Sequence, residues 1–286
     1  MVSKSSEIQG RVRRGFVHGP HGNIEYMAAG AGPALILLHS APSSCALFEE
    51  AIPLLADDFH VIAMSQPGFG ESDPPPVAYS TVNEYARVVT WLLDGLGIER
   101  ASVLGAHTSS LTALEVSAGW PERVERLVLE ECFNWSRPGR LEALERRHGF
   151  EEHATGSHLI AMWERAHGRT LRNTSEPAEV TRLTRRGFLD TVRAERPGPD
   201  GVSGQAASTR ALSQYQLWER APLVEAPTLV VHGSSSELGR AHERLLEAIP
   251  DARGIRPPTS HQFTWRVAPE LWADELRAFL TEPISL

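Results

Sequence analysis

His107, within the stretch Gly105-Ala106-His107-Thr108-Ser109, is the residue of this sequence whose setting most strongly suggests chemistry. An apolar run precedes the stretch and a helical pattern follows it, which predicts a sharp strand-to-helix turn of the nucleophile-elbow kind. The tip of such a turn is strained and leaves room only for small residues two positions before and after it. Gly105 and Ser109 meet this requirement. The turn therefore presents an imidazole where a serine, cysteine or aspartate is expected.

The patterns on both sides of this turn alternate between strands and helices. Two short runs around Pro20-His21-Gly22 predict a hairpin over 15–18 and 23–27. Continuous apolar runs predict strands buried on both faces at 34–38, 60–64, 101–106, 124–129 and 227–233, with a weaker strand near Ile255. Helices are expected at 47–56, 85–96, 238–248 and 271–280. This order predicts an α/β fold with a mostly parallel central sheet flanked by helices.

The pattern changes between Phe133 and Leu223, where arginine-rich helical segments replace strands. These segments are expected at 141–148, 158–167, 180–195 and 206–219. A helical block inserted between two strands can cover the carboxyl edge of the sheet, where open α/β sheets bind ligands. We therefore expect a core of residues 1–132 and 224–286 and an all-helical cap of residues 133–223.

Composition argues against several classes of function. The chain has 286 residues and a formal net charge of −8, which disfavours nucleic acid or an anionic membrane as a partner. No apolar run approaches the ~18 residues of a membrane helix. Cys45 and Cys132 give no disulfide framework, so we expect a cytoplasmic protein. No metal-ligand spacing or glycine-rich phosphate loop occurs. We expect a small-molecule substrate and neither metal nor cofactor, and the sequence leaves open whether the chain forms a homodimer.

Five motifs in register carry a resemblance to a known family. His39-Ser40-Ala41-Pro42 looks like a His-Gly oxyanion turn with serine in the glycine place, and Pro67-Gly68-Phe69-Gly70-Glu71-Ser72 looks like a Pro-Gly-x-Gly-x-Ser segment. The elbow, Pro121-Glu122-Arg123-Val124 and Thr259-Ser260-His261 complete the series. From about Gly15 to Leu280 the chain resembles the α/β-hydrolase superfamily, as a cap-containing member with histidine in place of the elbow nucleophile. The resemblance implies the α/β-hydrolase fold, but a fold does not fix a reaction.

The resemblance places the general base at His261, and an imidazole suits this role because it titrates near working pH. The usual position of the orienting acid holds Ser236, with Glu237 one residue later. Some relatives, including some haloalkane dehalogenases, use the end of the preceding strand, which here reads Glu130-Glu131. Successive strand residues point to opposite faces, and position matching favours Glu131. Glu237 is the alternative acid, and a solvated carboxylate pair is a third interpretation.

His107 allows several roles. The favoured one is a general acid/base or hydrogen-bond donor beside His261, because two facing imidazoles can titrate as a coupled pair. A covalent acyl-imidazole, a dead elbow in a binding protein, and a serine nucleophile displaced to Ser40, Ser43, Ser109 or Ser110 are the alternatives. The resemblance implies an oxyanion hole made by the backbone N–H groups of Ala41 and Thr108.

The segment over the sheet is expected to select the substrate. Candidate pocket residues are Ser40, Phe133, Trp135, His158, Met162, Trp163 and Trp218. Arg182, Arg185, Arg186 and Arg193 are interpreted as a solvated helix face. The sequence thus predicts an enzyme that acts on a small carbonyl- or ester-bearing molecule by histidine-based acid/base catalysis, in a hydrolysis or a lyase- or cyclisation-type reaction. The alternatives are a non-catalytic ligand-binding protein and a serine hydrolase with a displaced nucleophile.

Overall fold

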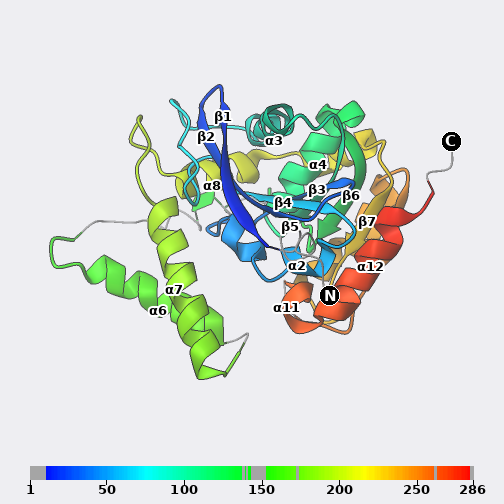
Figure 1. The fold of residues 1–286 in the computed structure, drawn as a ribbon. Helices are drawn as coiled ribbons and strands as arrows, with labels where there is room; N and C mark the ends of the chain where they lie inside the picture. The colour runs from blue at the N-terminus through cyan, green and yellow to red at the C-terminus, as the bar shows by residue number, and fades with distance from the viewer. Residues whose placement is uncertain are drawn as a thin grey trace.

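An eight-stranded sheet in the order β1-β2-β4-β3-β5-β6-β7-β8 forms the centre of the fold (Figure 1). The computed structural model describes residues 11–136, 139, 141–142, 153–171, 174–260 and 263–283. β1 pairs antiparallel with β2, and β2 with β4, whereas all other neighbours are parallel. The strands are β1 (Arg13–Gly19), β2 (Gly22–Ala29), β3 (Ala34–Leu38), β4 (His60–Met64), β5 (Ala101–Ala106), β6 (Val124–Glu130), β7 (Thr228–Val231) and β8 (Ala252–Ile255).

Helices cover both faces of this sheet, because the central strands, β3 and β4 above all, present apolar side chains in both directions. One apolar core lies between the sheet and α3 and α4, and a second lies between the opposite face and α2 and α12 (Figure 1). The helices of these layers are α2 (Ile52–Leu55), α3 (Val82–Leu96), α4 (Ser109–Gly119), α10 (His242–Ala248), α11 (Thr264–Val267) and α12 (Pro269–Thr281).

The predicted alternation of strands and helices is confirmed, and the ranges predicted for β3, β4 and β5 coincide with those of the structure. Three predicted helices, those at 47–56, 206–219 and 238–248, are each divided in two. The helix expected at 47–56 becomes η1 (Cys45–Phe48) and α2, because Pro53 lacks a backbone N–H and fits only the first turn of a new helix. The helix expected at 238–248 becomes η4 (Glu237–Ala241) and α10.

Four helices follow β6 in the chain and precede β7. α6 (Ser157–Leu171) and α7 (Pro177–Ala194) pack side by side and extend away from the sheet (Figure 1). α8 (Gly204–Gln214) contacts α3, and the extended backbone of Tyr215 separates it from α9 (Leu217–Arg220). The segment expected at 141–148 lies, apart from its first two residues, outside the described residues.

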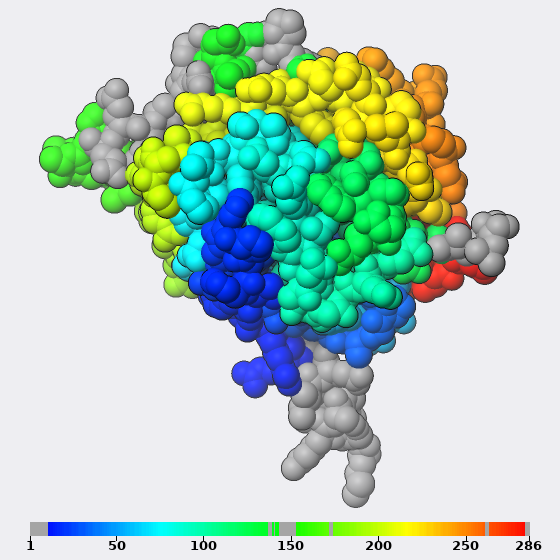
Figure 2. Space-filling view, turned by 90° about the horizontal axis from the view of Figure 1, so that it is seen from above, coloured from blue at the N-terminus to red at the C-terminus, as the bar shows by residue number. Residues whose placement is uncertain are grey.

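The remaining short helices are η2 (Pro121–Arg123) and η3 (Ala221–Leu223). Figure 2 shows the face on which the β1–β2 hairpin, α3, α4 and the stretch around α8 and α9 form a continuous surface. Cys45 and Cys132 are both buried and unbridged. Among the helices of the described ranges, none combines the length and apolar character needed to span a bilayer.

Candidate active site

His107 stands at the tip of the turn between β5 and α4. Its φ of 56° lies in the left-handed region that residues with a β-carbon rarely adopt. Two backbone hydrogen bonds hold the turn: the His107 N–H donates to the Glu130 carbonyl at 2.8 Å, and the Ser110 N–H to the His107 carbonyl at 3.1 Å. A β-carbon at Gly105 would lie 2.4 Å from the Ser109 carbonyl oxygen, so this position needs glycine. The local sequence thus fixes where the imidazole stands.

The ring of His107 lies between an aromatic wall and a cavity. Its centroid is 4.9 Å from that of Phe133 and 6.2 Å from that of Trp135, and both aromatic side chains are buried. The cavity has a volume of about 660 Å³, which is in the range of small-molecule sites. An imidazole at this boundary can exchange protons with a molecule bound in the cavity.

Three parts of the chain line the cavity. The floor comes from the loops after β3 and β5 and from η1, and consists of Ser40, Ala41, Pro42, Ser43, Leu47 and His107. The roof comes from α6 and α7, and consists of Ala166, Arg169, Thr170, Leu183, Arg186, Gly187 and Asp190. The side wall consists of Ser260, Phe263 and Arg266.

His261 lies outside the described residues, so its role as general base stays a prediction. The described residues on its two sides, Ser260 and Phe263, both line the cavity with His107. The carbonyl of Thr259 accepts a hydrogen bond from the Ser235 N–H at 3.2 Å, which ties this loop to the turn after β7.

Glu130 and Glu131 point to different partners, as expected for successive residues at a strand end. Glu131 accepts hydrogen bonds from the Gly233 N–H at 2.7 Å and the Ser236 hydroxyl at 2.5 Å. Glu130 accepts from the Thr264 N–H and the Trp272 indole N–H, each at 3.0 Å. Both carboxylates are fully buried, so the interpretation of a solvated pair is wrong.

Burial governs the protonation of the two carboxylates because it disfavours their charged forms. It raises the pKa of Glu130 to about 7, against which the Thr264 and Trp272 hydrogen bonds act. Burial likewise raises the pKa of Glu131. Glu237, the alternative acid, is exposed on η4. Of the two candidate acids, Glu131 is therefore the one held on the turn beside the loop of Thr259 and Ser260.

The two N–H groups expected to form the oxyanion hole are not equally available. The Ala41 N–H already donates to the Thr108 hydroxyl at 3.0 Å. Ala41 lines the cavity, so its amide can reach a substrate oxygen only when this hydroxyl turns aside. The sequence did not reveal this bond, because Thr108 and Ala41 are far apart along the chain.

The serines near the elbow differ in their accessibility. Ser109 and Ser110 are buried and donate to the carbonyls of His39 and His107, respectively. Ser40 and Ser43 line the cavity. A displaced serine nucleophile therefore fits Ser40 or Ser43 better than the two residues that follow the elbow.

The predicted pocket residues fall into two groups. Ser40 lines the cavity, and Phe133 and Trp135 contact the ring of His107. His158, Met162, Trp163 and Trp218 are not among the described residues that line it. Trp163 packs against Phe188 at 5.5 Å, and the Trp218 ring stacks under the Arg244 guanidinium at 3.9 Å.

Among the cavity residues that the pocket prediction missed, four are charged. Arg169, Arg186, Asp190 and Arg266 all line the cavity. Arg186, interpreted as part of a solvated helix face, has a side chain only 13% exposed, so that interpretation is wrong for this residue. The spacing of Arg182, Arg186 and Asp190 at intervals of four was the available signal, since it places them on one face of a helix.

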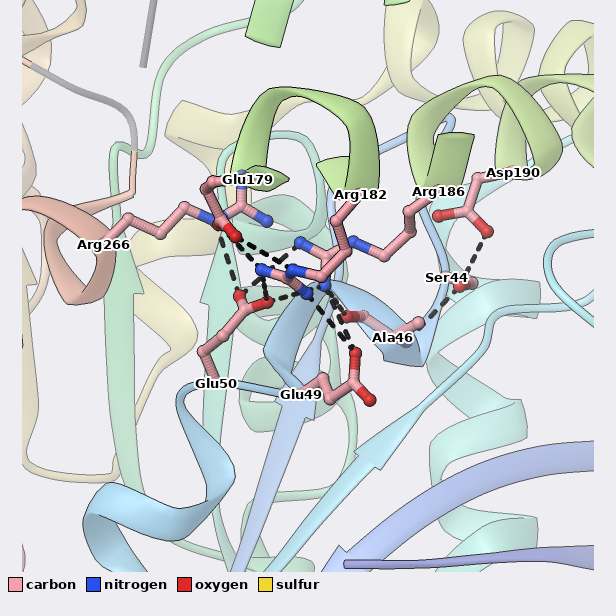
Figure 3. A network of polar contacts seen from close by, with 9 residues as sticks. All are labelled: Ser44, Ala46, Glu49, Glu50, Glu179, Arg182, Arg186, Asp190 and Arg266. Carbon is pink, nitrogen blue, oxygen red and sulfur yellow. Dashed lines mark hydrogen bonds and ion pairs between the residues drawn. The ribbon is translucent and has the colours of Figure 1, made fainter. Parts of the chain in front are cut away.

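Arg182, Arg186 and Arg266 converge on Glu50 (Figure 3). Arg186 donates to the Glu50 carboxylate at 2.9 Å and to the Ala46 carbonyl at 3.0 Å, which links α7 to η1 and the turn after it. Burial of Glu50 opposes its ionisation, but the arginines, Arg186 foremost, bring its pKa below the usual value. Within the described ranges, no group of three or more histidine, cysteine, aspartate and glutamate side chains is arranged to hold a metal ion.

Comparison with known proteins decides the family. The family model described as the alpha/beta hydrolase fold matches residues 33–263. The chain belongs to the alpha/beta hydrolase family. This alpha/beta hydrolase is 26% identical over 260 residues to the 2-(acetamidomethylene)succinate hydrolase of Mesorhizobium japonicum, a match that covers 88% of the chain and 89% of the relative. It is 31% identical over 114 residues to haloalkane dehalogenase 2 of Mycobacterium tuberculosis, covering 40% of each protein.

Solved structures agree with the fold. A hydrolase from Pseudomonas aeruginosa superposes with a TM-score of 0.77 at 24% identity, covering 94% of this chain and 99% of that protein. The enol-lactonase from Burkholderia xenovorans gives a TM-score of 0.75 at 20% identity, with coverage of 94% and 100%. The predicted fold class is thereby confirmed: an alpha/beta hydrolase fold with a mostly parallel sheet flanked by helices.

Proposed function

We propose that this alpha/beta hydrolase is an enzyme that acts on a small carbonyl- or ester-bearing molecule by histidine-based acid/base catalysis. The observation that carries the proposal is the imidazole of His107 at the strained tip of the elbow, on the floor of a cavity of about 660 Å³. Strained residues of this kind concentrate at functional sites. The relative from Mesorhizobium, a hydrolase of a small organic acid by its name, supports a small-molecule substrate.

The same proposal assigns residues 133–223 to a cap, because α6 and α7 supply the roof of the cavity. His261 serves as general base, oriented by Glu131, and His107 donates or accepts a proton at the substrate. A substrate oxygen is held by the Thr108 N–H, together with the Ala41 N–H once the Thr108 hydroxyl turns aside.

The expected rate enhancement is sufficient for reactions with low barriers. General acid/base catalysis contributes about 10²–10⁴-fold. An oxyanion hole with binding alone contributes about 10³–10⁴-fold. Together these factors correspond to about 7–11 kcal/mol. This range covers hydrolysis of activated esters, eliminations, enolisations and cyclisations better than amide hydrolysis.

The test compares turnover of an activated-ester panel with labelling by a fluorophosphonate, which marks nucleophilic serines. We expect turnover without labelling, and a loss of kcat of about 10²–10⁴-fold in His107→Ala. His18→Ala, which removes an exposed histidine of the β1–β2 hairpin, is the matched control and should keep full activity.

Three results would contradict the proposal. Labelling at Ser40 or Ser43 would support a displaced serine nucleophile. Ligand binding without turnover of any substrate, or turnover indifferent to His107→Ala, would remove His107 from the chemistry.

A further inference from the structure

The side wall of the cavity contains a guanidinium, that of Arg266, in which one nitrogen has no hydrogen-bond partner among the described residues. Arg266, on α11, has a side chain 17% exposed and lines the cavity with His107. Its Nε is buried and has no hydrogen-bond partner among the described residues. The Glu50 carboxylate lies 3.8 Å from this atom, and the guanidinium carbon lies 5.2 Å from the Phe263 ring centroid. A buried charged donor without an acceptor is costly, and the residue that carries it lines a cavity in which a bound molecule can supply an acceptor to the guanidinium.

The neighbouring charges leave Arg266 short of negative partners. Glu50 is shared with Arg182 and Arg186, and its two closest contacts are with these arginines, at 2.6 and 2.9 Å (Figure 3). Glu49 and Glu179 pair with Arg182 outside the cavity lining. Burial, reinforced by Arg186, lowers the pKa of Arg266 to about 10, which leaves it charged at neutral pH.

The lining as a whole carries more positive than negative charge. Arg169, Arg186 and Arg266 contribute three guanidinium groups, and Asp190 contributes one carboxylate. Asp190 accepts a hydrogen bond from the Ser44 hydroxyl at 3.0 Å, and burial raises its pKa to about 6. Leu47, Leu183 and Phe263 supply apolar surface in the same cavity.

We propose that the cavity binds the carboxylate group of an anionic small molecule, with Arg266 as its main partner and Arg186 beside it. This inference rests on the proposed function, since the carboxylate anchors the molecule whose carbonyl group lies against His107. A guanidinium matches a carboxylate with two parallel hydrogen bonds. The apolar lining accommodates a carbon skeleton, and Asp190 opposes the higher charge of a phosphate.

The test measures binding rather than turnover, so it does not depend on the proposed chemistry. Calorimetry with the full chain compares succinate, its uncharged analogue succinamide, and inorganic phosphate. We expect succinate to bind and succinamide to bind about 10–100-fold more weakly, the range for a lost hydrogen bond to a charged group. Succinate should bind His18→Ala, altered at an exposed residue of the β1–β2 hairpin, as it binds the unaltered chain.

Variants assign the effect to Arg266. Arg266→Gln should weaken succinate binding by about 10–100-fold. Arg266→Lys keeps the charge but loses the planar guanidinium that donates two parallel hydrogen bonds, so it should weaken binding less. Arg185→Gln removes an exposed charge from α7 and is the matched control, with succinate affinity unchanged. If Arg266→Gln does not fold, Arg266→Lys and the comparison of succinate with succinamide decide the question.

Each outcome of the binding test either supports or overturns the proposed carboxylate site. Equal binding of succinate and succinamide, no binding of succinate, or unchanged affinity in a folded Arg266→Gln would overturn the inference, and binding of phosphate alone would overturn the assignment to a carboxylate. Succinate binding without turnover of any substrate would retain the inference while removing the proposed function. Turnover of neutral esters without succinate binding would do the reverse.

Discussion

The floor and the roof of the cavity are built on different principles. On the floor, backbone hydrogen bonds fix His107, and a hydrogen bond from the Ala41 N–H to the Thr108 hydroxyl joins the loops after β3 and β5. The buried sheet lies directly beneath. On the roof, α6 and α7 pack on each other, and Arg182 and Arg186 of α7 connect it to Glu50 through ion pairs. The comparison teaches that the backbone fixes the residues of the floor, whereas charged side chains on a helix surface hold the roof. Under the proposed function, the floor carries the chemistry and the cavity arginines bind the substrate. Substitutions on the floor should therefore change kcat, and substitutions among the cavity arginines should change KM.

The largest effect compares a floor residue with a cavity arginine of the side wall. His107→Ala should lower kcat by about 10²–10⁴-fold, whereas Arg266→Gln should raise KM for a carboxylate substrate by about 10–100-fold. In the double variant the two losses should multiply, because independent sites are additive in free energy. Steady-state kinetics of all four proteins measure the cycle. A double variant no worse than His107→Ala would show that floor and side wall act as one unit.

The acid partner of the floor is tested by a matched pair of carboxylates. Glu131→Gln should lower kcat by about 10²–10⁴-fold, because an amide in place of the orienting carboxylate favours the wrong tautomer of the base. Glu237→Gln alters the exposed alternative on η4 and should leave kcat unchanged. The opposite ranking would transfer the role to Glu237.

A third substitution acts on the roof attachment. Glu50→Gln removes the carboxylate shared by Arg182, Arg186 and Arg266, so the free energy of unfolding should fall by about 1–3 kcal/mol. Succinate should bind several-fold more tightly because the positive charge of the lining is less compensated. Glu49→Gln is the control, since Glu49 is 53% exposed and its nitrogen contacts are 3.6 Å or longer. Weaker succinate binding in Glu50→Gln would show that the arginines must be held in place to bind an anion.

The smallest effect concerns stability rather than activity. Burial raises the pKa of Glu130 from 4.5 to about 7, so the folded chain keeps this proton at a pH where the unfolded chain loses it. The stabilising contribution is complete below about pH 4.5, falls as pH rises, and is lost above about pH 7, with a total on the order of 3 kcal/mol.

Glu130→Gln should flatten this part of the pH dependence, because the amide does not titrate. Urea unfolding at pH 5 and pH 8 measures the difference, and Glu122→Gln, at an exposed carboxylate of η2, should behave as the unaltered chain. An equal loss of stability with rising pH in Glu130→Gln would assign the titration to another group.

The fold and the elbow could be read from the sequence because both depend on local patterns. Continuous apolar runs mark β3, β4 and β5, and the small residues Gly105 and Ser109 mark the strained turn around His107. Position matching in the sequence favours Glu131 over Glu237. The burial of Glu131 and the exposure of Glu237, which support this preference, are visible only in the structure.

The charged lining could not be predicted in the same way. An arginine on a helix surface, such as Arg186, is predicted to be solvated. Its partner Glu50 is 136 positions earlier in the chain, so only the structure shows that the two side chains lie together. Likewise the hydrogen bond from Ala41 to Thr108 joins residues 67 positions apart. Pairings of this kind depend on the arrangement of the whole chain, and no periodic pattern in the sequence predicts them.

Arg182, Arg186, Asp190 and Arg193 follow one another at intervals of four, four and three residues along α7, so one face of a single helix carries much of the ionic character above the site. No strand contributes to this face. Descendants of a duplicated gene could therefore exchange or invert these charges and acquire new substrates, while the sheet and its elbow stayed as they are.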